Sequence, residues 1–391
     1  MTSRRIDDDE RRRRIVRRHH LGRAAPDATA VVRSVVAMHS SDPITPYLAC
    51  WARTAVLSRR DLEADLYETR MLCRLHAMRR TLFVVLADES GDFLAGATQR
   101  FLEQDRARVA GWVEAEDVDE SADVWLDDVS REALAVLERH GGELTTSELA
   151  DRVPRLQMPI TLGSGKWAQR APLSSRLLSL LAMDGRIVRT RPVGTWRSSQ
   201  YRWAASRQWF GRDHDERDPA AARTALARRY LQAYGPATLE DLRWWTGWTK
   251  RQTAAALDAV GACTVELDSG LEGFVLDDVE CSEQVDAVAL LPGLDPTPMG
   301  WKQRDFFLGD EHGVLFDRNG NIGPTVWVDG RIVGGWAQRS DGEIVWELLT
   351  DVGRERTDRI GERAVELTDW LDGVAVRTRF PSAFEKELAG R

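Results

Sequence analysis

Basic side chains are concentrated in one stretch of this 391-residue sequence, residues 145–203. Ten Lys and Arg residues accompany only three acidic ones there, so the stretch carries +7, whereas the whole chain carries −8. Guanidinium and ammonium groups at this density bind polyanions, most commonly the phosphate backbone of nucleic acid. The stretch is therefore predicted to bind nucleic acid, and the alternative is a small structural or regulatory module with a solvated basic face.

The same stretch has the pattern of a helix-turn-helix followed by a two-stranded wing. A hydroxyl-capped helix begins at Thr145 and ends at Pro154, and the leucines of residues 171–183 repeat at helical spacing. Residues 186–189 and 200–203 read as the two strands of the wing. The side chains expected to contact DNA in this unit are Lys166, Arg170, Ser174, Ser175, Arg176, Arg197, Ser198, Gln200 and Arg202.

Composition limits the other classes of function. Hydrophobic residues make up 43% of the chain, and no apolar run approaches the roughly 20 residues of a membrane span. The Arg-rich residues 1–23 have no apolar core of a secretory signal. The four cysteines are scattered without a CxxC pair, which argues against a disulfide framework or a zinc finger. We therefore expect a cytoplasmic, nucleoid-associated monomer that binds no membrane, metal or cofactor.

The order of predicted elements indicates an α+β protein with three tandem winged-helix units and a small C-terminal β domain that ends in a helix. Residues 114–128 contain eight acids and no base, which is typical of a solvated connection between helices. Asp329-Gly330 and Asp341-Gly342 predict hairpin turns in the β domain. The predicted boundaries are 1–87 for the first unit, 88–143 for a helical connector, 144–205 for the second unit, 219–277 for the third, and 285–391 for the β domain and its helix.

Short motifs along nearly the whole chain resemble one family, the tandem winged-helix DNA glycosylases of the AlkZ/YcaQ, azinomycin-resistance type. Each motif is weak alone, but their order and spacing are specific. The motifs include Tyr47-Leu48-Ala49-Cys50-Trp51-Ala52-Arg53, Met78-Arg79-Arg80-Thr81-Leu82-Phe83-Val84, Ser174-Ser175-Arg176-Leu177-Leu178, Gly235-Pro236-Ala237-Thr238, Leu290-Leu291-Pro292-Gly293-Leu294-Asp295-Pro296 and Gly334-Gly335-Trp336.

The resemblance implies a C-shaped protein with a positively charged cleft for duplex DNA. It also implies hydrolytic release of N7-alkylated or bulky antibiotic-adducted purines from damaged DNA, as in base excision repair or antibiotic self-resistance. Arg79 and Arg80, before a predicted strand, and Gln338 and Arg339, near a hairpin tip, are further candidates for DNA contacts.

The family's catalytic motif is Gln-apolar-Gln or Gln-apolar-Asp, and it aligns here with His39-Ser40-Ser41-Asp42. His39 stands in place of the first Gln, so the resemblance implies a base or a water-positioning group. A neutral imidazole accepts a proton from water, and its reference pKa of about 6.5 suits that role. Ser41 and Asp42 would assist. No lysine occurs in the motif, so a Schiff base and lyase activity are not expected.

Other interpretations remain open from the residues alone. His39 is as compatible with a structural histidine as with a catalytic one, and Ser41 and Asp42 suit a turn and its cap. A non-catalytic winged-helix protein, either a transcriptional regulator or a lesion-binding protein, would bind duplex DNA without needing His39. A scaffold that binds other proteins through its winged helices is a third class, which salt-insensitive or absent DNA binding would indicate.

Overall fold

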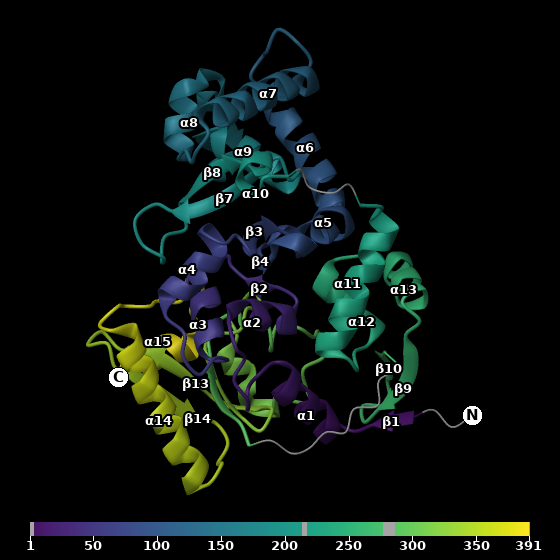
Figure 1. The fold of residues 1–391 in the computed structure, drawn as a ribbon, viewed down its shortest axis with the longest axis vertical. Coiled ribbons are helices and arrows are strands. Elements are labelled where there is room, and N and C mark those ends of the chain that lie inside the picture. The colour runs from purple at the N-terminus through teal and green to yellow at the C-terminus, as the bar shows by residue number, and fades with distance from the viewer. Residues whose placement is uncertain (1–3, 213–216, 277–285, 391) are drawn as a thin grey trace.

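A computed structural model describes residues 4–212, 217–276 and 286–390 (Figure 1). Helices and four sheets alternate along these residues, so the predicted α+β class is confirmed. Cys281 and the ends of two predicted units, at residues 277 and 285, lie outside the described residues. No helix among those described is both long and apolar enough to cross a bilayer.

After α1 (Asp8–Arg18), the first predicted unit contains three short helices, a two-residue strand and a β-hairpin. Val31, Val32 and Val35 are fully buried on one face of the first helix, as their helical spacing predicts. Ser58 and Asp61 form a capping box at the start of the third helix. The elements are α2 (Ala28–Val35), β2 (Met38–His39), α3 (Thr45–Trp51), α4 (Arg59–Tyr67), β3 (Leu72–His76) and β4 (Leu82–Leu86).

The hairpins of the first and second predicted units join in one five-stranded sheet, of order β2-β4-β3-β7-β8. The second hairpin consists of β7 (Ile187–Pro192) and β8 (Tyr201–Ala205), and Arg74 of β3 lies opposite Arg189 of β7. We expected two separate wings. Two separate hairpins would each leave the N–H and C=O groups of an edge strand without partners. Pairing β3 with β7 satisfies some of these groups, which explains the shared sheet.

The predicted helical connector packs into the core of the second unit. Val113, Leu126 and Val129 lie in one buried cluster with Leu149 and Leu177. The helices are α5 (Ser90–Phe93), a π-helical turn (Leu94–Thr98), α6 (Gln99–Glu114), α7 (Ala122–His140), α8 (Thr146–Arg152) and α9 (Ser174–Met183).

A β-hairpin between α8 and α9 was not predicted. It consists of β5 (Pro159–Leu162) and β6 (Gln169–Pro172), so the helix expected from residue 171 begins at Ser174 instead. Arg170 therefore lies on a strand and not on that helix. The turn needs Gly163, whose φ is +81° and where a Cβ atom would lie 2.7 Å from the carbonyl oxygen of Trp167.

The third predicted unit receives a strand from the N-terminus. β1 (Arg4–Ile6) pairs in parallel with β9, and Arg5 forms an ion pair with Asp268 at 2.8 Å. The predicted assignment of residues 1–87 to one unit did not foresee this pairing. The elements of this unit are α11 (Pro219–Tyr234), α12 (Leu239–Thr246), α13 (Lys250–Ala259), β9 (Cys263–Leu267) and β10 (Glu272–Val275), and α10 (Ser206–Phe210) precedes them.

The C-terminal region is an antiparallel sheet of order β11-β12-β13-β14, covered by two helices. Asp329 and Gly330 have positive φ angles in the tight turn between β12 and β13, as predicted. The last helix was not predicted, although Ser382 with Glu385 three residues later is a helix-start signal. The elements are β11 (Val288–Leu291), β12 (Thr325–Val328), β13 (Arg331–Gln338), β14 (Ile344–Leu348), α14 (Arg354–Leu371) and α15 (Ala383–Gly390).

Candidate active site

His39 occupies the end of β2, in the interior of the molecule. It lies opposite Phe83 in the antiparallel pair of β2 and β4, and the two rings meet edge to face with centroids 5.1 Å apart. The backbone N–H of Ser40 donates to the carbonyl oxygen of Leu82 at 2.7 Å and continues the pairing by one residue. Only 9% of His39 is exposed. The ring therefore has a fixed position next to the turn that follows the strand.

The surroundings of His39 favour the neutral imidazole. Burial lowers its pKa to about 3, and the charge of Arg79 adds to the effect. The backbone N–H of Ser41 points at Nδ1 from 3.4 Å, a long contact that favours the tautomer with its proton on Nε2. At neutral pH the ring therefore offers one unprotonated nitrogen and one N–H group.

Asp42 stabilises the turn after His39. Its Oδ1 accepts from the backbone N–H of Ile44 at 3.2 Å, and its Oδ2 accepts from the backbone N–H of Arg379 at 2.7 Å. Asp42 is 3% exposed, and burial raises the pKa of its carboxyl group. These contacts are those of a cap and not of a group that orients His39. Ser41 is half-buried, and its carbonyl oxygen accepts from Nη1 of Arg379 at 3.1 Å.

A buried arginine that the sequence analysis missed lies behind the motif. Arg74 projects from the middle of β3, and its Nε donates to Oγ of Ser40 at 3.1 Å. Its guanidinium also donates to the hydroxyl of Tyr67 and lies 5.1 Å from the ring centroid of Tyr201. The signal was an arginine inside the otherwise apolar strand Leu72-Cys73-Arg74-Leu75. Its contact with Ser40 fixes the residue between His39 and Ser41.

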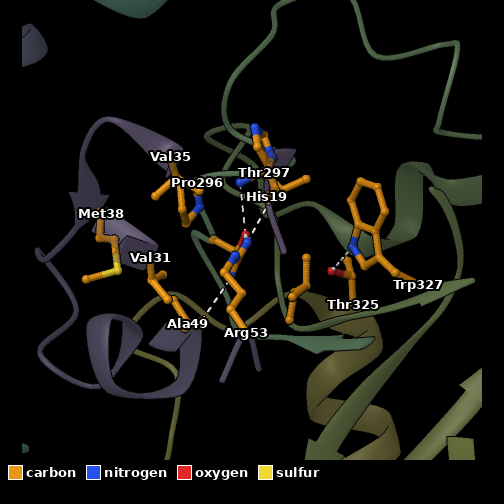
Figure 2. Close-up of polar contacts among 12 residues, drawn as sticks. His19, Val31, Val35, Met38, Ala49, Arg53, Pro296, Thr297, Thr325 and Trp327 are labelled. Atoms are coloured by element: carbon orange, nitrogen blue, oxygen red, sulfur yellow. Dashed lines mark hydrogen bonds and ion pairs between the residues drawn. The ribbon is translucent and has the colours of Figure 1, made fainter. Parts of the chain in front are cut away.

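A buried ion pair ties the helix after the motif to the C-terminal region (Figure 2). The guanidinium of Arg53 donates to both carboxylate oxygens of Asp295, at 2.6 and 2.8 Å, and to Oγ1 of Thr297 at 2.7 Å. The same hydroxyl lies 2.9 Å from Nδ1 of His19. At the start of α3, Thr45 donates to the carbonyl oxygen of Gly293 at 2.8 Å. Helix α3, which follows the motif, is thus held at its start by Thr45 and just after its end by Arg53.

Arg79 and Arg80 form a strained turn, Met78–Arg80, between β3 and β4. Their φ angles are +54° and +63°, a conformation that is costly for side chains with a Cβ and is concentrated at functional sites. Arg79 lies over the ring of Trp244, 4.4 Å from its centroid. Arg80 forms an ion pair with Asp105 at 3.1 Å. The turn presents two cations beside the candidate site.

Acidic partners neutralise part of the charge that the sequence concentrates in residues 145–203. Arg170 pairs with Glu116 of the acidic stretch at 2.5 Å, and Arg202 pairs with Glu148 at 3.3 Å. Ser174 is only 4% exposed, so its side chain is not on the surface where a DNA contact was expected. Ser175 and Arg176, the next residues of α9, are exposed.

The tip of the β5–β6 hairpin exposes an aromatic ring that the sequence analysis did not single out. Trp167 is 73% exposed, and the ammonium of Lys166 lies 5.4 Å from its ring centroid. An exposed ring beside a cation on a protruding turn suits contact with a nucleobase or a groove.

The remaining candidates lie around the tips of two hairpins. Arg197 donates to the carbonyl oxygen of Ala375 at 2.7 Å, and Oγ of Ser198 accepts from the backbone N–H of Gln200 at 3.1 Å. Gln338 donates to the carbonyl oxygen of Val374 at 3.2 Å, so it holds another segment of the chain. Arg339 pairs with Glu343 at 2.9 Å. Within the described residues, no group of three His, Cys, Asp or Glu could hold a metal ion.

Comparisons with known proteins place these residues in a wider context. The model of a family described as "DNA glycosylase AlkZ-like" matches residues 32–370, which include His39 and the turn after it. An interstrand DNA cross-link repair glycosylase from Streptomyces sahachiroi is 27% identical over 363 residues, covering 88% of this chain and 89% of the relative. The solved structure of the Streptomyces sahachiroi DNA glycosylase AlkZ superposes with a TM-score of 0.72 at 21% identity, covering 93% of this chain and 97% of that one.

Proposed function

Because the chain belongs to the AlkZ-like DNA glycosylase family, we propose that it is a monofunctional DNA glycosylase that releases N7-alkylated purines from duplex DNA by hydrolysis. The observation that carries this proposal is a fixed and neutral imidazole, His39, inside the residues that match the family. The motif resemblance aligns His39 with the first Gln of the family's catalytic motif. The resemblance of the motifs and the basic surface of the second predicted unit support it.

The proposed reaction makes modest demands on the protein. Alkylation at N7 puts a positive charge on the purine, so the base leaves readily and the sugar becomes an oxocarbenium-like cation. The enzyme must place a water molecule on the open face of that sugar and accept its proton. Neither a metal ion nor a covalent intermediate is required for these steps.

His39 is proposed to hold the attacking water through Nδ1, whose present contact with the backbone N–H of Ser41, at 3.4 Å, is long enough for the water to displace it. Its pKa of about 3 makes it a weak base. A weak base is sufficient here, because water that attacks a cation loses its proton only after the new bond has formed. Ser41, on the same turn, is proposed to donate a second hydrogen bond to that water, while Asp42 keeps the turn in place through its two backbone contacts.

The proposed partner is damaged duplex DNA, bound by the protein as a monomer. The exposed candidates for contact are Lys166, Ser175, Arg176, Arg197 and Gln200. Arg170, Arg202 and Arg339 would exchange their present carboxylate partners for phosphate. The Streptomyces sahachiroi relative is named for interstrand cross-link repair, which supports cross-linked DNA as a substrate. Bulky N7 adducts and a role in antibiotic self-resistance are proposed from the resemblance of the motifs.

The proposal is tested by incubating an excess of the protein with duplex DNA that carries one N7-methylguanine, and in parallel with one bulky N7-guanine adduct. Released base is measured by mass spectrometry, and the abasic site by cleavage in alkali. We expect release of at least one of the two bases above the rate of spontaneous depurination. Salt-sensitive DNA binding without release of either base would instead support the non-catalytic, lesion-binding alternative.

A further inference from the structure

The segment that joins α14 to α15 lies over the candidate catalytic turn, outside the residues that the family model matches. Residues 373–381 run from the end of α14 to α15 beside the first predicted unit, whose Leu57 accepts a hydrogen bond from Trp370 at 2.7 Å (Figure 1). We call residues 373–381 the C-terminal strap.

Alternate side chains of the strap face opposite ways. Val376 and Thr378 line a small enclosed space together with Asp42 and Trp336. Ala375, Arg377 and Arg379 are exposed, whereas Val376 is buried and Thr378 is half-buried, and the three exposed residues line an open cavity. This is the period of two that an extended chain imposes. The strap therefore presents two guanidinium groups, two residues apart, on one surface.

Three side chains from distant elements hold the strap. Gln338 accepts from the backbone N–H of Val376 at 2.6 Å and donates to Val374. Arg197, at the tip of the β7–β8 hairpin, donates to the carbonyl oxygen of Ala375. Asp42 accepts from the backbone N–H of Arg379. The positions of the two strap arginines are thus determined by the hairpin tip and the catalytic turn.

The cavity has a volume of about 600 Å³ and three arginines in its wall: Arg197, Arg377 and Arg379. The carboxylate on the wall is that of Asp42, whose two oxygens already accept backbone N–H groups. Among the described residues Arg377 has no hydrogen-bond or ion-pair partner, and its side chain is exposed. Three arginines in one wall, with a single carboxylate that is already engaged, suit the binding of a singly or doubly charged oxyanion.

We propose that Arg197, Arg377 and Arg379 bind a phosphate of the DNA strand that carries the target nucleotide. The proposal rests on the glycosylase function proposed above and adds the residues that hold the backbone beside the reacting sugar. Because Arg379 also donates to the carbonyl oxygen of Ser41, the bound phosphate and the catalytic turn share one residue. In this proposal Arg377 contacts only the phosphate, whereas Arg379 contacts the phosphate and also holds the catalytic turn.

The first experiment measures affinity for an undamaged duplex by fluorescence anisotropy over a series of salt concentrations. The experiment needs no catalysis, so it measures the contribution of this site to DNA binding even if the protein excises no base. We expect Arg377→Ala to weaken binding several-fold at low salt and to reduce the slope of log K against log salt by about one, and Arg377→Glu to weaken it further. Arg377→Lys should retain most of the slope.

The control is Arg354→Ala, which removes an arginine with 95% of its side chain exposed at the far end of α14. It should leave both the affinity and the slope unchanged. Equal slopes for wild type, Arg377→Ala and Arg354→Ala would overturn the proposal, whether or not the protein is a glycosylase.

The second experiment identifies the phosphate. A series of duplexes is made, each with one neutral methylphosphonate at a different position around the target nucleotide. The affinity of each duplex is measured for wild type and for Arg377→Ala. We expect one position at which the methylphosphonate weakens wild-type binding but not that of the variant. Weakening that is the same for both proteins at every position would show that Arg377 meets no backbone phosphate near the target.

Discussion

The backbone N–H of Arg379 donates a hydrogen bond to Oδ2 of Asp42 at 2.7 Å, although 337 positions separate the two residues. The turn after His39 is thus stabilised by the C-terminal strap as well as by its own chain. Oδ1 of the same carboxylate accepts from Ile44, two residues along. The carboxylate therefore couples the candidate catalytic turn to the C-terminus.

Asp42→Ala is expected to lower the free energy of unfolding by about 1–3 kcal/mol, because it leaves two partly buried N–H groups without an acceptor. Asp42→Asn retains one carbonyl oxygen and should cost less. Urea unfolding measures both. The same loss of stability in the two variants would show that the two backbone contacts do not carry the effect.

Arg53→Met is expected to destabilise the protein by about 3–5 kcal/mol, because the carboxylate of Asp295 would remain buried without its cation. Both side chains of this pair are 0% exposed. The control is Arg354→Ala, which removes an exposed contact to Asp358 and should change stability by no more than about 0.5 kcal/mol. If Arg53→Met unfolds at the wild-type urea concentration, the network in Figure 2 does not stabilise α3.

Glu385→Gln is expected to stabilise the protein at alkaline pH. Burial raises the pKa of Glu385 to about 7, above the usual value for Glu, with the hydrogen bond from Thr378 opposing the shift and Asp42 adding to it. The folded protein therefore keeps this proton up to about pH 7, whereas the unfolded chain releases it near the usual Glu value. Stability is lost as pH rises between these two values. A neutral amide removes that loss.

Thermal unfolding at about pH 4, below the usual pKa of Glu, and at about pH 8.5 measures this effect. Glu385→Gln should melt higher than wild type only at the higher pH, whereas Glu362→Gln, at an exposed position of α14, should show no such difference. A Glu385→Gln variant that melts with wild type at both values would contradict a raised pKa.

Excision should show no inflection from His39 between about pH 5 and pH 8. The pKa of this imidazole is lowered to about 3, so protonation removes its lone pair only below that value. Single-turnover rates for an N7-methylguanine duplex, corrected for spontaneous depurination, give the profile, with Glu385→Gln as the control for the carboxyl group that titrates near pH 7. A rise centred near pH 6.5 in both proteins would show that His39 titrates as an exposed histidine.

Elements with strong local signals could be predicted from the sequence. The capping box of Ser58 and Asp61 and the Asp329-Gly330 turn determine their elements through neighbouring residues. The pairing of β1 with β9, and of β3 with β7, depends on strands that meet only in the folded chain. No local pattern specifies which free edge a short strand will find.

The candidate site, like the fold, could be predicted only where the signal is local in the sequence. The family motif pointed to His39, and the cap role of Asp42 was one of the two interpretations that the sequence analysis gave for that residue. The contacts of Arg74 and Arg379 with the motif could not be predicted, because each crosses between elements far apart in sequence. For the same reason, counting charges along the sequence does not reveal which arginines form ion pairs, such as Arg170 with Glu116.

The most direct measurement is the single-turnover rate of N7-alkylguanine release by wild type, His39→Ala and His39→Gln, with affinity for the same duplex measured alongside. We predict that His39→Ala lowers the rate by about 10²–10⁴-fold with little change in affinity, and that His39→Gln, which restores the residue of the family motif, retains much of the rate. Release by His39→Ala at the wild-type rate would contradict the central role of His39.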